Sequence, residues 1–198
     1  MAYREELKNR INEFIESQTG NICVSLFDLK EQDGFSIDGD RRVPSASMIK
    51  LVIMAELMRR VCAGELSLEE KIKNTQEMRT GGDGVLKELE PGHEFSLREI
   101  LTLMIIVSDN EATNILIQML GMDRINRMAA ELGLKEAVLG RKMMDSEAKK
   151  QGRDNFICAD DIMLILKKIY EGSCVDRKAS ALMLDILKRQ QQSGRLQL

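Results

Sequence analysis

Two strand-like runs near the start of the chain, followed by a body whose pattern is helical almost throughout, constrain the fold more than any other feature. Residues 22–29 form a short apolar run rich in β-branched side chains, and residues 35–38 alternate between apolar and polar side chains, with the turn-prone residues 31–34 between them. The two runs predict a β-hairpin. Because an isolated hairpin is marginal in water and its outer edges need partners, this one must pair or pack against further structure.

Apolar periodicity predicts helices over most of the remaining chain. Residues 3–18 carry Leu7, Ile11, Phe14 and Ile15 on one stripe, and Gly20 ends that segment. Two later segments begin with the Ser-x-x-Glu pattern of a capping box, and glycines end others. After residue 45 the predicted helices cover 47–62, 67–73, 96–107, 111–120, 123–132, 159–171 and 176–190.

The composition excludes several classes of protein. The chain has 198 residues, of which 43% are hydrophobic, and can bury a substantial core. Its 29 basic and 32 acidic residues give a net charge of −3, which offers no broad attraction to nucleic acid or anionic lipid. The longest apolar runs, such as 100–107, fall well short of the roughly 20 residues of a membrane span. We therefore expect a soluble protein with no nucleic-acid partner and no membrane span.

The first residues also carry an expectation about location. The start MAYREELKNR is charged and lacks the apolar stretch of a secretory signal. The sequence therefore predicts a cytoplasmic protein. A chain from which a signal had been removed would look the same, and would be secreted.

Cysteines and histidine give little sign of metal, disulfide or thiol chemistry. Cys23, Cys62, Cys158 and Cys174 have no Cys-x-x-Cys spacing and lie mostly in apolar segments, so we expect buried free thiols rather than disulfides or a metal site. His93 follows a Pro-Gly pair and is expected on a surface loop, which leaves histidine-dependent catalysis without a strong candidate. No cofactor is expected.

The glycine-rich residues 80–84 are a weak candidate for phosphate binding. No Gly-Lys-Ser/Thr follows them, and no evident strand precedes them. We expect a flexible connection here.

The first pattern with catalytic meaning is Ser47-Met48-Ile49-Lys50, at the start of an apolar helix. A serine and a lysine three residues apart share one helix face, and the serine lies near unpaired backbone N–H groups. A lysine in an apolar wall can have its pKa lowered enough to take the proton of a serine nucleophile. Taken alone, the pattern is better explained by Ser47 as a helix N-cap and Lys50 as a surface lysine, because Ser-x-x-Lys often occurs by chance.

The second pattern is Ser108-Asp109-Asn110, which interrupts two apolar helical segments. Such a triplet also suits a helix stop followed by an N-cap. Ser-x-x-Lys followed by Ser-Asp-Asn, each at a predicted helix boundary, is more specific than either pattern alone. The combination belongs to the signature of class A β-lactamases and penicillin-binding proteins.

From about residue 3 onward the chain resembles the class A β-lactamase and penicillin-recognising serine hydrolase family. The resemblance includes Gly84-Val85-Leu86-Lys87 and Pro91-Gly92, which precede the Ser-Asp-Asn segment. It implies an α+β, β-lactamase/transpeptidase-like fold, in which a helical domain adjoins a five-stranded antiparallel sheet and the active site lies between them.

The resemblance also implies roles for matched residues. Ser47 would be the acylated nucleophile, and Lys50 would take or relay its proton. Ser108 would pass a proton to the departing ring nitrogen, while Asn110 would hold the substrate amide and the Lys50 side chain. The Ser47 backbone N–H would supply half of an oxyanion hole.

One departure from the family lies in residues 139–148. The family's glutamate, which activates the deacylating water, is matched here by Met143 when Arg141 is aligned. Asp145 or Glu147 could substitute for that acid only if a water fitted between its carboxylate and Ser47, and the alternative is that both are surface acids. Further along, Arg153 or Asp154 is expected to form a structural ion pair.

The second departure is the absence of Lys-Thr-Gly, with only two of the five expected strands found. Three explanations follow, in order of preference: the sequence is truncated before that strand, another chain contributes the missing sheet, or the protein is a non-catalytic remnant. Exposed strand edges would then allow a homo-oligomer.

The sequence thus predicts a serine hydrolase that opens β-lactam or D-alanyl peptide amide bonds through a Ser47 acyl-enzyme. The alternatives are a penicillin-binding peptidase or esterase with slow deacylation, and a non-catalytic protein that acts by assembly or strand complementation. The expected organisation is an N-terminal helix and hairpin over 1–45, a helical lobe with the active-site motifs over 46–175, and a return helix and tail over 176–198.

Overall fold

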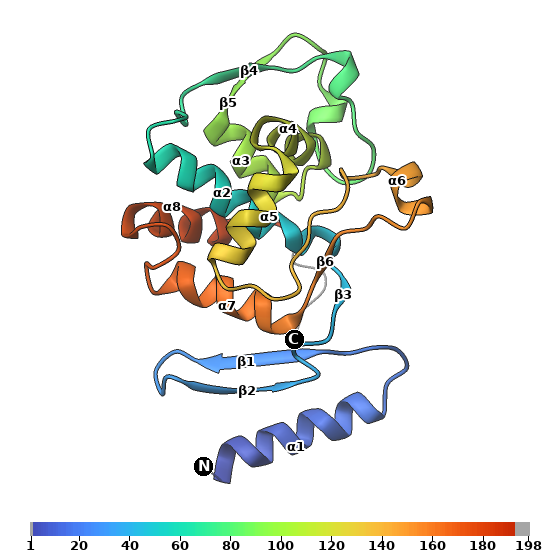
Figure 1. Ribbon diagram of the computed structural model, residues 1–198, viewed down its shortest axis with the longest axis vertical. Coiled ribbons are helices and arrows are strands. Elements are labelled where there is room, and N and C mark those ends of the chain that lie inside the picture. Colours follow the sequence, from blue (N-terminus) through green and yellow to red (C-terminus); the bar gives the residue numbers. More distant parts are fainter. Residues whose placement is uncertain (1, 193–198) are drawn as a thin grey trace.

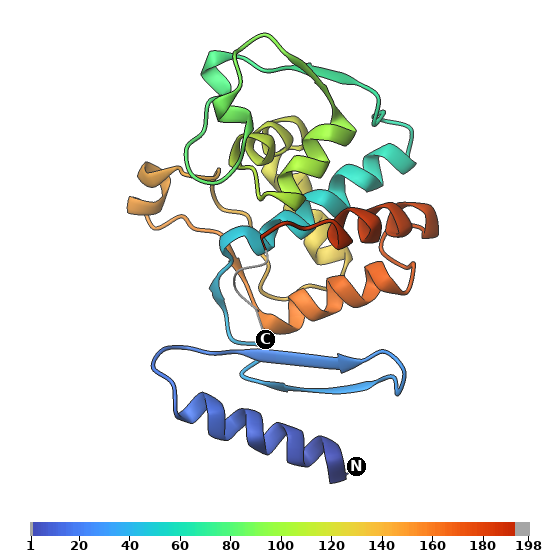
Figure 2. The same ribbon diagram turned by 180° about the vertical axis from the view of Figure 1, so that it is seen from behind.

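The N-terminal part of the molecule is a helix followed by a hairpin, as the sequence predicts. The computed structural model describes residues 2–192, beginning with α1 (Ala2–Glu16). Strands β1 (Val24–Asp28) and β2 (Asp33–Ile37) pair antiparallel, with Val24 opposite Ile37. Figure 1 shows the hairpin between α1 and the helical body, and the view from behind shows the same layering (Figure 2).

The remaining elements form a helical body with two small sheets, each of two strands. Strand β3 (Val43–Pro44) pairs with β6 (Phe156–Ile157), and β4 (Lys71–Lys73) pairs with β5 (Glu94–Ser96), both antiparallel. The helices are α2 (Lys50–Cys62), α3 (Leu97–Ile106), α4 (Asn110–Leu120), α5 (Met122–Glu131), α6 (Ser146–Lys150), α7 (Ala159–Tyr170) and α8 (Arg177–Lys188), with 3-10 turns η1 (Ala46–Ile49), η2 (Gln76–Met78) and η3 (Leu86–Glu88).

The hydrophobic core is built around α2, whose first nine residues are all buried. It packs against α3, α4, α5 and α8, and its apolar side chains bring those helices into one cluster. All the buried apolar residues of that cluster lie between Ile49 and Ile186. Thus α1 and the hairpin contribute nothing to it, and β1 rests against the outside of α7.

One predicted helix is wrong. Residues 67–73 form a turn followed by strand β4, although Ser67 and Glu70 have the spacing of a capping box. The Ser67 hydroxyl accepts a hydrogen bond from the Glu69 N–H and caps only this turn. The carbonyl oxygens of Leu68 and Glu70 instead accept hydrogen bonds from the segment that begins α3, which draws the chain into the β4–β5 pair.

The other helix boundaries agree with the predictions to within a few residues. Ser96 and Glu99 form the predicted capping box at the start of α3, with reciprocal hydrogen bonds. Gly121 ends α4 with φ of +82°, a conformation that glycine adopts without steric cost. The helix-rich α+β class with small antiparallel sheets is therefore confirmed.

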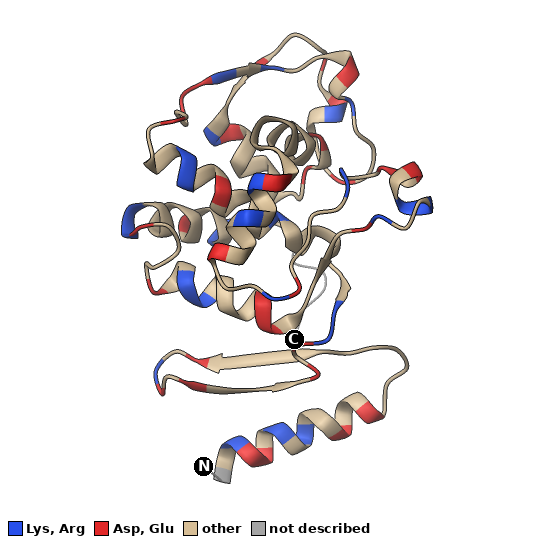
Figure 3. Cartoon of the chain, viewed as in Figure 1, with Lys and Arg blue, Asp and Glu red and all other residues tan. Residues whose placement is uncertain are grey.

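Basic and acidic residues are interspersed on the face shown in Figure 3. No helix within residues 2–192 combines the length and the apolar character that crossing a membrane requires.

Candidate active site

Four polar residues from three separate positions in the fold meet at one point. Ser47 lies in η1, Lys50 begins α2, Ser108 lies between α3 and α4, and Asn110 begins α4. The Ser47 and Ser108 hydroxyl oxygens are 2.8 Å apart, and the Lys50 Nζ is 2.8 Å from the Ser108 Oγ. The structure thus brings together all four residues that the sequence singled out, with Ser108 linking Ser47 to Lys50.

Lys50 is buried, with 2% of its surface exposed, and does not extend to solvent. Its Nζ is 2.7 Å from the Ser108 carbonyl oxygen and 3.1 Å from the Asn110 Oδ1. Burial lowers the pKa of Lys50 to about 8, although the nearby Asp109 and Asp83 carboxylates act in the opposite direction and raise it. A substantial fraction of Lys50 is therefore neutral near pH 8.

The backbone around both serines is tightly constrained. Ser45, rather than Ser47, is the N-cap of η1, and its N–H donates to the Asn155 carbonyl oxygen at 2.8 Å. Ala46 and Ser108 both have positive φ, of 44° and 55°, which costs energy for residues other than glycine. The flanking hydrogen bonds hold them in this strained conformation, and the Ser47 side chain reaches the cleft.

Asp109 fixes the position of α4 relative to the preceding loop. It is the N-cap of α4, since its Oδ1 accepts from the Ala112 N–H at 2.9 Å. Its Oδ2 accepts from the N–H groups of Val85 and Leu86, at 2.6 and 2.9 Å. Asp109 is 1% exposed, so its carboxylate depends on these protein donors for hydrogen bonds.

The glycine-rich residues 80–84 are not the flexible connection expected from the sequence. The Asn110 N–H donates to the Asp83 carbonyl oxygen, and the Asn110 side-chain amide donates to that of Gly81. The φ of Gly84 is +122°, and a Cβ added to this residue would lie only 2.4 Å from the Asp109 carboxylate. Glycine is needed because the loop packs directly against Asp109 and Asn110, and so the loop forms a wall of the site.

A cleft of about 470 Å³ opens beside Ser47. One side is formed by the η1 region and the 80–84 loop, and the other by residues of the 141–155 segment. Its lining residues are Pro44, Ala46, Ser47, Asp83, Asn110, Arg141, Met143, Met144, Asp145, Ser146, Lys149, Asp154 and Asn155. The cleft gives a small molecule access to the Ser47 hydroxyl.

Met143 lines this cleft and is held there by α4. The Met143 N–H donates to the Asn114 Oδ1 at 2.8 Å, and the Asn114 amide donates to the Met143 carbonyl oxygen at 3.1 Å. Asp145 also lines the cleft, but its carboxylate caps α6 by accepting from the Ala148 N–H. Glu147 is exposed and pairs with Lys150.

The predicted structural ion pair in this segment is confirmed for Asp154. Its carboxylate accepts a hydrogen bond from Arg141 at 2.8 Å, while Arg153 contacts Gln151 instead. Asn155 holds the same turn, because its Oδ1 accepts from the N–H groups of Gly140 and Arg141.

Sequence reasoning missed Asn114 and Asn155 as supports of the site. Asn114 follows Asn110 by one helical turn, so the i, i+4 spacing was a signal that both amides face the same side. Nothing local marks Asn155, since its partners come from a distant part of the chain.

The remaining candidate groups lie away from the cleft. His93 is exposed, as predicted. All four cysteines are free, but only Cys158 and Cys174 are buried, whereas Cys62 is exposed and Cys23 is half-buried. Within residues 2–192 no cluster of histidine, cysteine and carboxylate side chains has metal-binding geometry.

Comparison with known proteins identifies the family of this arrangement. The family model described as "Beta-lactamase enzyme family" matches residues 6–198. Beta-lactamase VEB-1 of Pseudomonas aeruginosa is 28% identical over 122 residues, covering 61% of this chain and 41% of that relative. A crystal structure of a beta-lactamase from Sphaerobacter thermophilus is 33% identical with a TM-score of 0.77, covering 85% of this chain and 62% of that one.

A penicillin-binding protein also has the same fold. A mutant of PBP-A, solved as an acyl-enzyme complex with penicillin G, is 26% identical with a TM-score of 0.84, covering 94% of this chain and 69% of that one. The chain thus spans less than two thirds of VEB-1 and of the S. thermophilus enzyme. The family match extends over nearly all of its own length, and the chain belongs to the beta-lactamase enzyme family.

Proposed function

We propose that the protein is a serine hydrolase that opens β-lactam or D-alanyl peptide amide bonds by acylation of Ser47. The observation that carries this proposal is the continuous chain of contacts from the Ser47 hydroxyl through Ser108 to the buried Lys50 amine. A pure binding module has no use for a buried lysine whose pKa lies near 8.

The contacts of Lys50 suit a base in its neutral form. A neutral amine has two N–H donors and one lone pair, and two of its three neighbours, the Ser108 carbonyl oxygen and the Asn110 Oδ1, are acceptors only. The lone pair then faces the third neighbour, the Ser108 hydroxyl. This arrangement leaves Lys50 ready to accept a proton.

Acylation then proceeds in balanced proton steps. The Ser47 oxygen bonds to the amide carbonyl carbon, its proton passes to the Ser108 oxygen, and the Ser108 proton passes to Lys50. When the carbon–nitrogen bond breaks, Lys50 returns a proton through Ser108 to the departing nitrogen. The Ser47 backbone N–H would stabilise the developing oxyanion, and Asn110 would hold the substrate amide.

We further propose that deacylation is slow. Hydrolysis of an acyl-enzyme requires a base to activate water, and Met143 stands where the family places its glutamate. Asp145 is used as a helix cap, and Glu147 pairs with Lys150 outside the cleft lining. The protein would therefore behave as a penicillin-binding peptidase more than as a fast β-lactamase.

The decisive test is the intact mass of the protein before and after incubation with benzylpenicillin. We expect a stoichiometric adduct of one penicillin per chain on the wild type and none on Ser47→Ala, because the substitution removes the nucleophile. A persistent adduct supports slow deacylation, and rapid loss supports β-lactamase turnover. An adduct on Ser47→Ala, or a folded wild type that neither forms an adduct nor hydrolyses benzylpenicillin, contradicts the proposal.

Met143→Glu is expected to shorten the lifetime of that adduct by about 10²-fold, the usual contribution of general-base catalysis. The Asn114 hydrogen bonds use only backbone groups of Met143, so the new side chain keeps the same attachment. The measurement is the decay of the adduct mass after excess penicillin is removed. Met143→Gln is the matched control, since it has the shape of glutamate without its basicity. Equal decay rates in the two variants would show that the side chain at position 143 does not activate the deacylating water.

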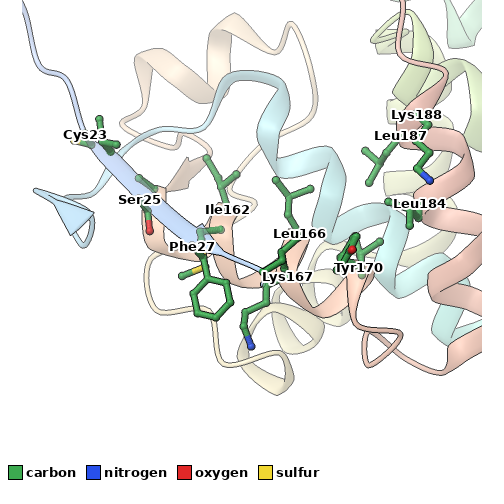
Figure 4. Close-up of a pocket in the computed structure, with 15 residues that line it drawn as sticks. Cys23, Ser25, Phe27, Ile162, Leu166, Lys167, Tyr170, Leu184, Leu187 and Lys188 are labelled. Carbon is green, nitrogen blue, oxygen red and sulfur yellow. The ribbon is translucent and has the colours of Figure 1, made fainter. Parts of the chain in front are cut away.

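A second candidate function is assembly by strand addition, favoured by an apolar groove between β1, α7 and α8. The outer edge of β1 has no strand partner within residues 2–192. A groove of about 650 Å³ adjoins it, and Phe27, Leu166 and Tyr170 lie around that groove (Figure 4). Leu166 and Tyr170 are 39% and 57% exposed. An added strand would cover these side chains and pair with β1.

The solution mass separates the two candidates. A dimer or larger assembly that forms without acylation supports strand addition, and a monomer that forms the penicillin adduct supports the hydrolase alone. The expected division of the chain at about residues 45 and 175 into lobes also belongs to this proposal, with the N-terminal helix and hairpin as the part that receives the added strands.

A further inference from the structure

A buried carboxyl group without a partner lies beside the candidate site. Glu111 is the second residue of α4, directly after Asn110, and is 1% exposed. Neither of its carboxylate oxygens forms a hydrogen bond to any residue in the range 2–192. Burial of an ionised carboxylate without partners is strongly unfavourable, so this environment favours the neutral acid.

The segment packed over this part of α4 is the wall of the cleft. Arg79 and Thr80 directly follow η2, which contacts α4, and residues 80–84 continue from them to Asn110. The Arg79 guanidinium donates to the carbonyl oxygens of Leu86 and Leu89 rather than to Glu111. The Arg79 guanidinium, whose charge acts on Glu111, is therefore already engaged in hydrogen bonds within the wall.

The charges around Glu111 act in opposite directions. Burial raises the pKa of its carboxyl group, the nearby Thr80 N–H and the Arg79 guanidinium lower it, and the Asp109 carboxylate raises it. The result is a pKa above the ordinary 4.5.

The other ionisable groups on the elements packed here have their own partners. The Lys50 ammonium group contacts Ser108 and Asn110, and Lys87 of η3 donates to the Gly82 carbonyl oxygen. Glu88 of η3 pairs with Lys87, and the Glu77 carboxylate of η2 is held by Thr75. Glu111 is thus a buried carboxyl group under the wall that forms no ion pair within residues 2–192, and burial outweighs the Thr80 N–H and Arg79 in its surroundings.

We propose that Glu111 is a positioning residue that keeps residues 79–89 packed against the start of α4 only while its carboxyl group is protonated. Deprotonation places an uncompensated charge beneath the wall. That charge either draws Arg79 away from Leu86 and Leu89 or admits water, and both outcomes loosen the loop that orients Asn110. The effect on the fold is independent of the proposed acylation of Ser47, whereas the effect on catalysis rests on it.

The first test uses no substrate and compares the urea midpoints of wild type and Glu111→Gln from pH 4 to pH 9. A carboxyl whose pKa is raised by folding binds more protons in the folded state, so wild-type stability falls as the pH rises from about 4.5 to the folded pKa and is then level. The midpoint of Glu111→Gln should therefore match the wild type near pH 4 and exceed it at neutral pH. The matched control, Glu88→Gln, removes an exposed carboxylate from the same segment and should show no such change.

Amide hydrogen exchange then locates the effect. At pH 8 the amides of residues 79–89 should exchange several-fold faster in wild type than in Glu111→Gln, with no difference near pH 4. A midpoint difference that stays constant with pH, or an exchange difference spread evenly over the chain, overturns the proposal.

The link to catalysis has its own readout, which is the ratio of the acylation rates of Glu111→Gln and wild type. The titration of Lys50 cancels in this ratio, so we expect the ratio to be several-fold higher at pH 9, where Glu111 is ionised in the wild type, than at pH 5. If the ratio of the two acylation rates does not change with pH, the proposed link between Glu111 and catalysis is wrong. If neither protein forms an adduct, the proposed function fails, and the urea and exchange measurements still decide the role of Glu111.

Discussion

Replacement of Lys50 by methionine should lower the rate of acylation by benzylpenicillin about 10³-fold, the middle of the range for a general base. Methionine keeps the length and apolar packing of the side chain, so the buried start of α2 remains filled. The Ser47 hydroxyl keeps its contact with Ser108, but the proton relay then ends without a base. The measurement is the rate at which the adduct mass appears in a series of quenched samples.

The pH dependence of the same rate gives an independent check on Lys50. Only the neutral amine accepts a proton, so the wild-type rate should rise steeply with pH below pH 8 and level off above it, following the pKa of about 8, and Glu111→Gln should show the full tenfold rise per pH unit. Lys50→Met should lose this rise. Lys150→Met is the control, because that lysine is 72% exposed and pairs only with Glu147. A Lys50→Met protein that acylates within tenfold of the wild type would show that Lys50 is not the base.

Replacement of Asp109 by alanine should lower the free energy of unfolding by about 4 kcal/mol. The substitution leaves three backbone N–H donors, those of Val85, Leu86 and Ala112, without their acceptor. Each hydrogen bond to a charged group contributes about 1.5–3 kcal/mol, and part of the loss is recovered as the loop relaxes toward water. The measurement is urea unfolding followed by far-ultraviolet circular dichroism.

Asp176→Ala is the matched control for this experiment. Asp176 is the N-cap of α8 and accepts from the Ala179 N–H, and its side-chain partner from another segment is the thiol of Cys62, a weak donor. Its loss of stability should therefore be much smaller. Equal losses in the two variants would mean that Asp109 acts as an ordinary helix cap and that Val85 and Leu86 find other partners.

The residues of the candidate site could be predicted from the sequence because each part of the site is local. The spacing of Ser47 and Lys50 places both on one side of a single helical turn, and Asp109 has the residue type of an N-cap. The order of contacts, with the Ser108 hydroxyl between Ser47 and Lys50, could not be read from the sequence. It depends on the positive φ of Ser108 at the junction of α3 and α4, where hydrogen bonds from Asp109 and Lys50 hold the backbone.

The failed predictions share a cause, which is competition from distant partners. Residues 67–73 have a good local signal for a helix, but hydrogen bonds from the start of α3 hold them as a turn and a strand. Residues 80–84 have the composition of a flexible loop, and Asp109 and Asn110 nevertheless hold the segment in place. Pairings across such distances have no signature in local propensity.

The absence of core residues from α1 and the hairpin also affects the order of folding during synthesis. These elements precede the helical body in the chain and leave the ribosome before it, yet none of their described side chains belongs to the buried cluster. The helix against which β1 rests, α7, is translated only after the whole of α2 to α6. The N-terminal segment therefore cannot dock against the helical body until α7 has been translated. Its docking is a late, long-range step and not the nucleus from which the protein folds.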